Sequence, residues 1–320
     1  MGQAENWALA GVVVGLLLVA TAIGQVLRRQ PQLGLNPAAV DAFNSRLQAW
    51  WIICCLLAVA FWSEVLTVAL FGFVSFWSLR EFITLTPTRM GDHRALFWVF
   101  FFFTPLQYVL LWLDGREDYD TYGLYSILIP VFALLFIPMR IALAGDPKRF
   151  LERVAKIQCG LLICVYCLSF APALLYLHWK DTVYSERARL LFFFILLSLM
   201  SEALQFVWGR IYGRHVVAPE INATRTWEGL LGGTASTALV GMSLWWATPY
   251  TQLWHVALVS MLTAVMSFGG AMTMSAIKRD RGVKDYGTLV QGHGGLLDRI
   301  DSICFAAPVF YHVTRQLLAP

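Results

Sequence analysis

Residues 190–208 read LLFFFILLSLMSEALQFVW, an apolar run whose single charged side chain is Glu202. A helix needs about 20 residues to cross the roughly 30 Å hydrocarbon layer of a membrane. Lipid accepts only segments that satisfy their own backbone hydrogen bonds. A run of this length and composition is therefore typical of a transmembrane helix.

Similar runs recur along the chain, in which 58% of the 320 residues are hydrophobic and only 14% are charged. This balance argues against a soluble fold. We predict an all-α, polytopic integral membrane protein with about ten transmembrane helices, the second and third short enough to form a re-entrant pair or to be tilted. The predicted spans are residues 7–27, 47–62, 65–79, 95–113, 124–143, 160–177, 190–208, 230–246, 253–274 and 300–318.

The basic residues predict the orientation of these spans. If the connecting loops alternate between the two sides of the membrane, most of the 24 lysines and arginines fall on one side. Basic loops favour the cytosolic side, so both termini are expected outside. The long loops 209–229 and 276–299 would then face the compartment that contains nucleotides.

The six cysteines lie in or beside apolar runs. No histidine or second cysteine pair is spaced to complete a zinc site with them. Cys164 and Cys167 have the spacing of a redox pair, but inside a predicted membrane helix we interpret them as small apolar residues.

Residues 275–301, SAIKRDRGVKDYGTLVQGHGGLLDRID, crowd charged side chains and glycines between two strongly apolar runs. Charged groups near membrane depth are costly unless they are paired, hydrated or bound to ions. Their density predicts a functional site, although a Lys-Arg pair alone is common in basic loops.

This segment contains groups that suit phosphate and a hard cation. Lys278, Arg279, Arg281 and Lys284 concentrate positive charge, and the glycines at 292–295 let backbone amides approach a ligand. Two aspartates three residues apart at a helix start project from nearly one face and can share magnesium. They are Asp298 and Asp301.

The segment resembles the C-terminal signature of the phosphatidate cytidylyltransferases. The matching residues are Ser275, Lys278, Arg279, Lys284, Asp285, Gly287, His293, Gly294, Gly295, Asp298, Arg299 and Asp301. An upstream loop is similar to a second motif of that family through Gly209, Arg210, Gly213, Arg214, Ala218, Pro219, Thr226, Trp227, Glu228, Gly229, Gly232 and Gly233. Because the resemblance begins near residue 190, we divide the chain into an N-terminal transmembrane helical region, 1–189, and a C-terminal cytidylyltransferase-like catalytic region, 190–320.

The resemblance implies an enzyme that joins CTP to phosphatidic acid, or to a related phospholipid, and forms CDP-diacylglycerol and diphosphate. It implies one or two magnesium ions, a location in the bacterial inner membrane with the site facing the cytosol, and a homodimer. No nucleic-acid partner is expected. The implied catalytic residues are Lys278, Arg279, Lys284, Asp285, His293, Asp298, Arg299 and Asp301. The implied substrate-binding residues are Arg210, Arg214, Arg225, Thr226, Glu228, Ser275, Gly294 and Gly295, and the implied metal ligands are Asp298, Asp301 and Glu202.

Three departures from the family pattern predict a divergent member. Ala271 stands where many members have an aspartate, and Glu202 replaces an aspartate in the helix before the first basic loop. Residues 222–224 replace Ser-Pro-Lys, which leaves Arg225 as the local charge. Each lost charge-assisted contact is worth about 1.5 to 3 kcal/mol.

Three alternatives stay open. A degenerate member would bind acidic lipid or nucleotide without turnover, as the alanine at 271 suggests. A related enzyme would use another phosphorylated lipid or another nucleotide. A transporter or channel would use Glu202 inside its apolar run, but the sequence has no internal repeat of the kind common in transporters.

Overall fold

The protein is described by a computed structural model that places residues 63–85, 88–116, 120–177, 184–283, 285–287 and 295–318, with isolated positions before residue 52. The first two predicted spans, 7–27 and 47–62, lie largely outside these residues. Lys284, His293 and Gly294 lie outside them as well.

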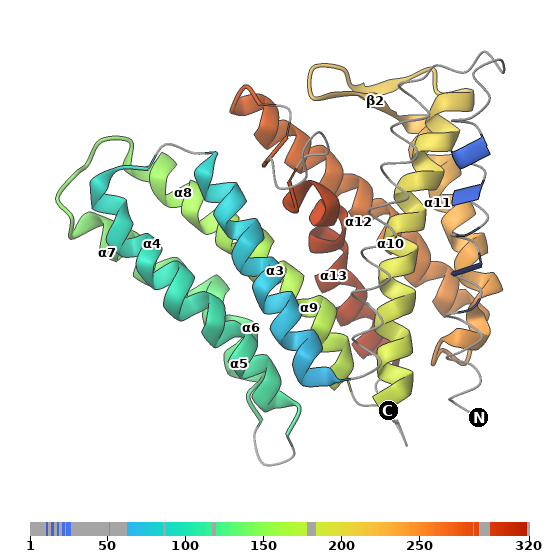
Figure 1. Cartoon of the computed structure of the whole chain (residues 1–320), viewed down its shortest axis with the longest axis horizontal. Helices are drawn as coiled ribbons and strands as arrows, with labels where there is room; N and C mark the ends of the chain where they lie inside the picture. Colours follow the sequence, from blue (N-terminus) through green and yellow to red (C-terminus); the bar gives the residue numbers. More distant parts are fainter. Residues whose placement is uncertain are drawn as a thin grey trace.

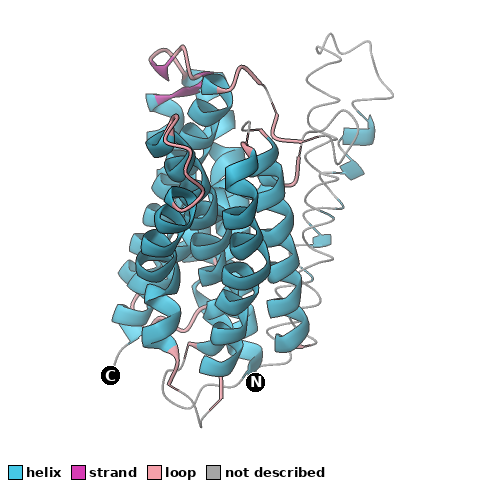
Figure 2. Cartoon of the chain, turned by 90° about the vertical axis from the view of Figure 1, so that its left-hand side faces the viewer, coloured by secondary structure: helices cyan, strands magenta, loops and turns pink. Residues whose placement is uncertain are grey.

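Long helical segments run side by side through the described part of the chain (Figures 1 and 2). Several are built from two successive helices. The elements are α3 (Glu64–Thr84), α4 (His93–Trp98), α5 (Thr104–Asp114), α6 (Tyr122–Ile127), α7 (Leu134–Ala142), α8 (Phe150–Leu161), α9 (Leu168–Ala173), α10 (Tyr184–Tyr212), α11 (Trp227–Ser243), α12 (Leu253–Asp280) and α13 (Leu297–Leu318).

Six helical segments of the described residues are long and apolar enough to cross a membrane. They are Glu64–Thr84, Met90–Asp114, Tyr122–Ala142, Phe150–Tyr176, Tyr184–Tyr212 and Leu253–Asp280. The prediction of a polytopic helical membrane protein is thereby confirmed, whereas the count of ten stays a prediction. The predicted span 65–79 belongs to α3, whose 21 residues suffice to cross a membrane without a re-entrant partner.

Three of the segments contain a π-helical turn. The turns are Val99–Phe103, Leu128–Ala133 and Leu162–Cys167. Pro105 follows the first turn and Pro130 lies within the second. Because proline lacks an N–H and its ring presses on the preceding turn, a π-helical turn is a local adjustment with which such a helix can continue.

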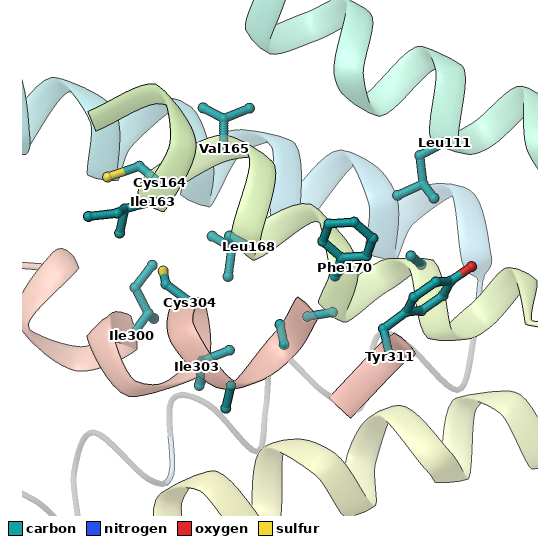
Figure 3. Close-up of a cluster of buried hydrophobic side chains, with 14 of the residues drawn as sticks. Leu111, Ile163, Cys164, Val165, Leu168, Phe170, Ile300, Ile303, Cys304 and Tyr311 are labelled. Carbon is teal, nitrogen blue, oxygen red and sulfur yellow. The ribbon is translucent and has the colours of Figure 1, made fainter. Parts of the chain in front are cut away.

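Helix α13 lies at the centre of the bundle, where it packs against α3, α9, α10 and α12. Figure 3 shows Cys304 of α13 facing Cys164 and Leu168, and Tyr311 beside Phe170, with ring centroids 5.2 Å apart. Cys164 and Cys304 are buried and free. The interpretation of the cysteines as apolar packing residues agrees with these positions.

Both predicted motif loops lie at one end of the bundle, the upper end in Figure 1. The first contains an antiparallel hairpin of β1 (Val216–Ala218) and β2 (Asn222–Thr226), in which Val216 lies opposite Thr226. The sequence analysis did not anticipate this hairpin. The last turns of α3 and α12 and the first turn of α13 lie at the same end, so residues distant in sequence can form one site there.

A buried ion pair fixes α8 near this end. The Arg153 guanidinium donates two hydrogen bonds to Asp92 Oδ1, from Nε at 2.9 Å and from Nη2 at 2.6 Å. Both side chains are buried. Arg153 Nη1 donates to the carbonyl oxygens of Asp146 and Lys148 at 2.8 and 3.1 Å. Arg89 donates to the Asp146 carboxylate and holds its pKa below the ordinary value.

Arg153→Ala is expected to destabilise the protein strongly. The change leaves Asp92 as a buried charge without its ion-pair partner, with only the Arg89 N–H as a donor among the described residues, and breaking such a pair typically costs about 3 to 5 kcal/mol. Thermal unfolding in mild detergent measures the loss. The control is Arg94→Ala at an exposed position of α4, where a change of less than about 0.5 kcal/mol is expected. Equal losses for the two variants would contradict a structural role for the buried pair.

Candidate functional site

The first motif loop is positioned by close contact between α10 and α11. A methyl group on Gly233 would lie 2.7 Å from Gln205 Cα, and one on Gly229 would lie 2.7 Å from the Gln205 carbonyl oxygen. Only glycine allows the two backbones to approach so closely. The Thr226 hydroxyl caps α11 by accepting the Gly229 N–H at 3.0 Å. These contacts fix the point at which β2 enters the bundle.

Glu228 shapes the same loop from the first turn of α11. Its Oε2 accepts the N–H groups of Arg214 and His215 at 3.1 and 3.2 Å, and its Oε1 pairs with the His215 ring. Arg210 and Arg214 have exposed side chains. In the described part of the chain, no hydrogen bond or ion pair joins these two arginine side chains to the second motif, so the structure does not bring them into the centre of the site.

Arg225 has a different environment from the other arginines of the loop. Its Nη1 donates to Gln205 Oε1 at 3.1 Å, and Gln205 Nε2 donates to the Ala264 carbonyl at 2.9 Å. The guanidinium lies 5.9 Å from the centre of the Phe268 ring. The buried Gln205 thus links β2 to α12. The sequence analysis missed this residue, whose only signal is an amide one turn after Glu202 in an apolar run.

Two contacts join the hairpin to the end of α12. Asn222 Nδ2 donates to Ser275 Oγ at 3.1 Å, and Arg279 Nε donates to the Ile221 carbonyl at 3.3 Å. The structure therefore brings the two predicted motifs together, although they are more than 50 residues apart in sequence.

An ion pair joins the end of α12 to the start of α13. Lys278 Nζ donates to Asp298 Oδ1 at 2.7 Å, and both side chains are largely buried. Asp298 Oδ2 accepts the N–H groups of Tyr286 and Gly295 at 2.8 and 3.0 Å. Asp298 thus holds the loop against α13, and both of its oxygens have donors within the protein.

Asp301 lies near the start of α13, which packs against α10 and α12. Asp301 is buried, with only 8% of its surface exposed. Within the described residues its carboxylate accepts one hydrogen bond, from the Ser302 N–H to Oδ1 at 2.7 Å. The charges that act on it are the carboxylate of Glu202 from α10 and the cations of Lys278 from α12 and Arg225 from β2. This cluster of Asp301, Glu202, Lys278 and Arg225 is called the central charge cluster below.

The crossing of α12 and α13 brings the backbone close to this cluster. A methyl group on Gly270 would lie 2.8 Å from the Asp301 carbonyl oxygen. The next residue, Ala271, is buried. The position at which the resemblance implies an aspartate is therefore next to the helix crossing, and here its side chain has no oxygen.

Two carboxylates of the central charge cluster, those of Glu202 and Asp301, are candidate ligands for a metal ion. The described residues contain no group of three or more His, Cys, Asp and Glu side chains arranged to hold one. Magnesium, however, is usually bound by one or two carboxylates together with substrate phosphates and water. Glu202 and Asp301 fit that smaller requirement, whereas the oxygens of Asp298 already accept hydrogen bonds from the protein.

The remaining predicted residues have varied positions. Arg299 is half-buried in the first turn of α13, and Gly295 is buried just before it. Asp285 is exposed. A second residue that the sequence analysis missed is Glu81 of α3, whose carboxylate accepts the N–H groups of Leu296 and Leu297 at 3.0 and 2.8 Å.

Comparison with known proteins identifies relatives over most of the chain. The sequence model of the cytidylyltransferase family matches residues 44–317. A protein of Escherichia coli strain K12 named "Uncharacterized protein YnbB" is 34% identical over 303 residues, which cover 94% of this chain and 95% of that protein.

Other relatives match over shorter segments. The phosphatidate cytidylyltransferase of Synechocystis is 40% identical over 115 residues, 35% of this chain and 39% of that enzyme. The phosphatidate cytidylyltransferase of Mycobacterium leprae is 33% identical over 183 residues, 56% of this chain and 55% of that enzyme. These alignments therefore span only part of the relatives that have this name.

Gly233→Ala is expected to destabilise the protein by separating α10 from α11. Overpacking of this kind typically costs about 1 to 3 kcal/mol. The matched control is Gly269→Ala in α12, where nothing lies within 4 Å of the added methyl group. In that open helical position alanine is expected to be neutral or to stabilise by up to about 1 kcal/mol. Thermal unfolding of the two variants in detergent compares them, and a stable Gly233→Ala protein would refute the close contact.

Proposed function

The chain belongs to the cytidylyltransferase family, and from this premise we propose that it transfers the CMP group of CTP to phosphatidic acid. The products would be CDP-diacylglycerol and diphosphate. The observation that supports this most is the central charge cluster. It combines carboxylates and cations at the junction of the two motif loops, and it lies at the end of a bundle whose helices can cross a membrane.

The reaction demands little covalent chemistry of the protein. A phosphate oxygen of the lipid would attack the α-phosphorus of CTP, and the bond from that phosphorus to the bridging oxygen of the β-phosphate would break. Diphosphate leaves with the electron pair of that bond. Catalysis of such a transfer rests on alignment and on stabilising negative charge.

The cations of the cluster would bind the phosphates. The charges of Lys278 and Arg225 act on Asp301, and Arg279 donates to the Ile221 carbonyl of the hairpin at 3.3 Å. Lys278 is held by Asp298 at 2.7 Å, so little side-chain freedom remains to be lost when a phosphate binds. A positioned cation of this kind stabilises a developing charge without reorganisation.

Glu202 and Asp301 would hold magnesium in this proposal. When bound, the ion would neutralise phosphate charge and orient the triphosphate. The Glu202 and Asp301 carboxylates repel each other, and Lys278 and Arg225 offset part of this repulsion at Asp301. A bound cation would offset the rest, which supports magnesium as their partner.

We also propose that the site faces the cytosol from a bacterial inner membrane. The end of the bundle that carries the central charge cluster is also the more basic end, with residues such as Arg89, Lys148 and Arg279. Such an excess of basic residues favours the cytosolic side. A cytosolic site would have direct access to CTP.

A second candidate function is binding of CTP or acidic lipid without turnover. Two observations favour it. Ala271 provides no carboxylate next to the crossing of α12 and α13, and the oxygens of Asp298 are engaged by protein donors.

Transfer of label from α-phosphate-labelled CTP into lipid tests the proposed function. The purified protein in mild detergent, with phosphatidic acid and magnesium, is expected to form labelled lipid. Asp301→Asn is expected to lower the rate at least about 100-fold, because a ligand for the phosphate-bound cation is lost. The matched control is Asp280→Asn, which removes the same charge at a side chain that is 66% exposed and is expected to leave the rate within about twofold.

The outcomes separate the candidates. If folded protein forms no labelled lipid and Asp301→Asn still binds CTP, the protein binds its ligand without turnover and is not an enzyme of this reaction. If label appears only when another phosphorylated lipid is supplied, the protein is a cytidylyltransferase whose acceptor is that lipid and not phosphatidic acid.

Labelling of single cysteines tests the orientation. A membrane-impermeant maleimide added to intact cells is expected to label Asp120→Cys, in the loop between α5 and α6. It is expected not to label Glu220→Cys, in the turn of the hairpin at the opposite end of the bundle. Both positions are exposed, and the parent protein measures the background from its own cysteines. The reverse pattern would place the site outside.

A further inference from the structure

Glu81 is a buried carboxylate near the end of α3, where it is only 5% exposed. No ion pair with lysine, arginine or histidine is found for it in the described part of the protein. Burying a carboxylate is costly unless several hydrogen bonds satisfy it. The burial of Glu81 therefore requires an explanation from its other contacts.

Backbone amides at the start of α13 supply these contacts. Glu81 Oε1 accepts the Leu296 N–H at 3.0 Å and the Trp77 Nε1–H at 3.2 Å, and Oε2 accepts the Leu297 N–H at 2.8 Å. The first N–H groups of a helix have no partner within the helix, and the helix dipole favours a negative charge there. Glu81 thus caps a helix whose first residue is 216 positions later in the chain.

The loop before α13 is shaped around the same carboxylate. A methyl group on Gly287 would lie 2.8 Å from Glu81 Oε1, and one on Gly295 would lie 2.5 Å from Oε2. Glycine at both positions lets the backbone approach Glu81 from two sides. The side chain therefore lies between two parts of the second motif.

The residue after Glu81 strengthens this connection. The Phe82 ring stacks on Tyr286, with centroids 6.2 Å apart and planes at 16°. Tyr286 is buried, its hydroxyl donates to the Met274 carbonyl at 3.0 Å, and its N–H donates to Asp298. The end of α3 thus contacts the loop at Tyr286, whose N–H donates to Asp298, and the helix at Leu297, the residue before Asp298.

We propose that Glu81 is a positioning residue for the transfer reaction: its carboxylate sets the start of α13 and thereby the places of Asp298, Lys278 and Asp301. This inference rests on the proposed function. Asp298 is the next residue after Leu297, and Asp301 follows one turn later. A displacement of about 1 Å at a site that aligns two reactants can lower the rate about 100-fold.

Conservative variants separate charge from shape. Glutamine keeps the size of Glu81 but turns an N–H₂ group toward backbone donors, so one amide loses its acceptor. Aspartate keeps the charge on a side chain shorter by one methylene. The matched control is Glu64→Gln, which removes a carboxylate from the first turn of the same helix, at the opposite end of α3 from Glu81.

Kinetics of lipid labelling give the first readout. Glu81→Gln is expected to lower kcat about tenfold or more while KM for CTP changes less than about threefold, because the phosphate-binding cations remain and their alignment is lost. Glu81→Asp is expected to recover part of this loss, and Glu64→Gln to match the parent. An unchanged kcat for folded Glu81→Gln protein would overturn the proposal.

Hydrogen exchange gives a second readout that does not depend on activity. In Glu81→Gln, the amides of Leu296 and Leu297 are expected to exchange at least about tenfold faster, while peptides from α8 and α9 stay as in the parent. Unchanged exchange at these two amides would also overturn the proposal, as would faster exchange spread evenly over the bundle. If the parent forms no labelled lipid, the proposed function fails, and local exchange still decides whether Glu81 positions α13.

Discussion

The burial of the Asp301 carboxylate is the constraint on which the site depends. A charge removed from water needs compensation. One backbone N–H and the cations of Lys278 and Arg225 favour the charge of Asp301, whereas burial and the Glu202 carboxylate oppose it. The two cations come from α12 and β2. Arg225 is in turn held by Gln205. The Asp301 carboxylate thus interacts with charged groups from three other parts of the chain, α10, α12 and β2.

The sequence predicted the helices well because lipid imposes a simple rule on length and polarity. The run at 190–208 lies within α10 and that at 253–274 lies within α12. Length and polarity do not predict the hairpin at 216–226, because it lies at the end of the bundle and is held by tertiary contacts such as the one between Asn222 and Ser275. The first two predicted spans lie largely outside the described residues, so the number of spans stays a prediction.

The site was predictable only where its chemistry is concentrated in the sequence. Lys278, Asp298 and Asp301 attract notice because charge is dense around them. Glu81 follows Arg80 just after a predicted span, and Gln205 lies in the same apolar run as Glu202. Their partners are mostly backbone groups, which leave no complementary side chain in the sequence. The metal role of Asp298 stays a prediction. The spacing of residues does not show its hydrogen bonds to Lys278 and to backbone amides of the loop.

The contacts of Glu81 also bear on the division of the chain at residue 189. The family match begins at residue 44, and α3 contributes both a carboxylate and a stacked ring to the second motif. An N-terminal region that served only to hold the protein in lipid would need neither. A capping carboxylate from another helix restricts α13 in a way that no residue of its own loop can, because its position is fixed by the packing of α3. The N-terminal helices are therefore part of the scaffold that sets the geometry of the central charge cluster.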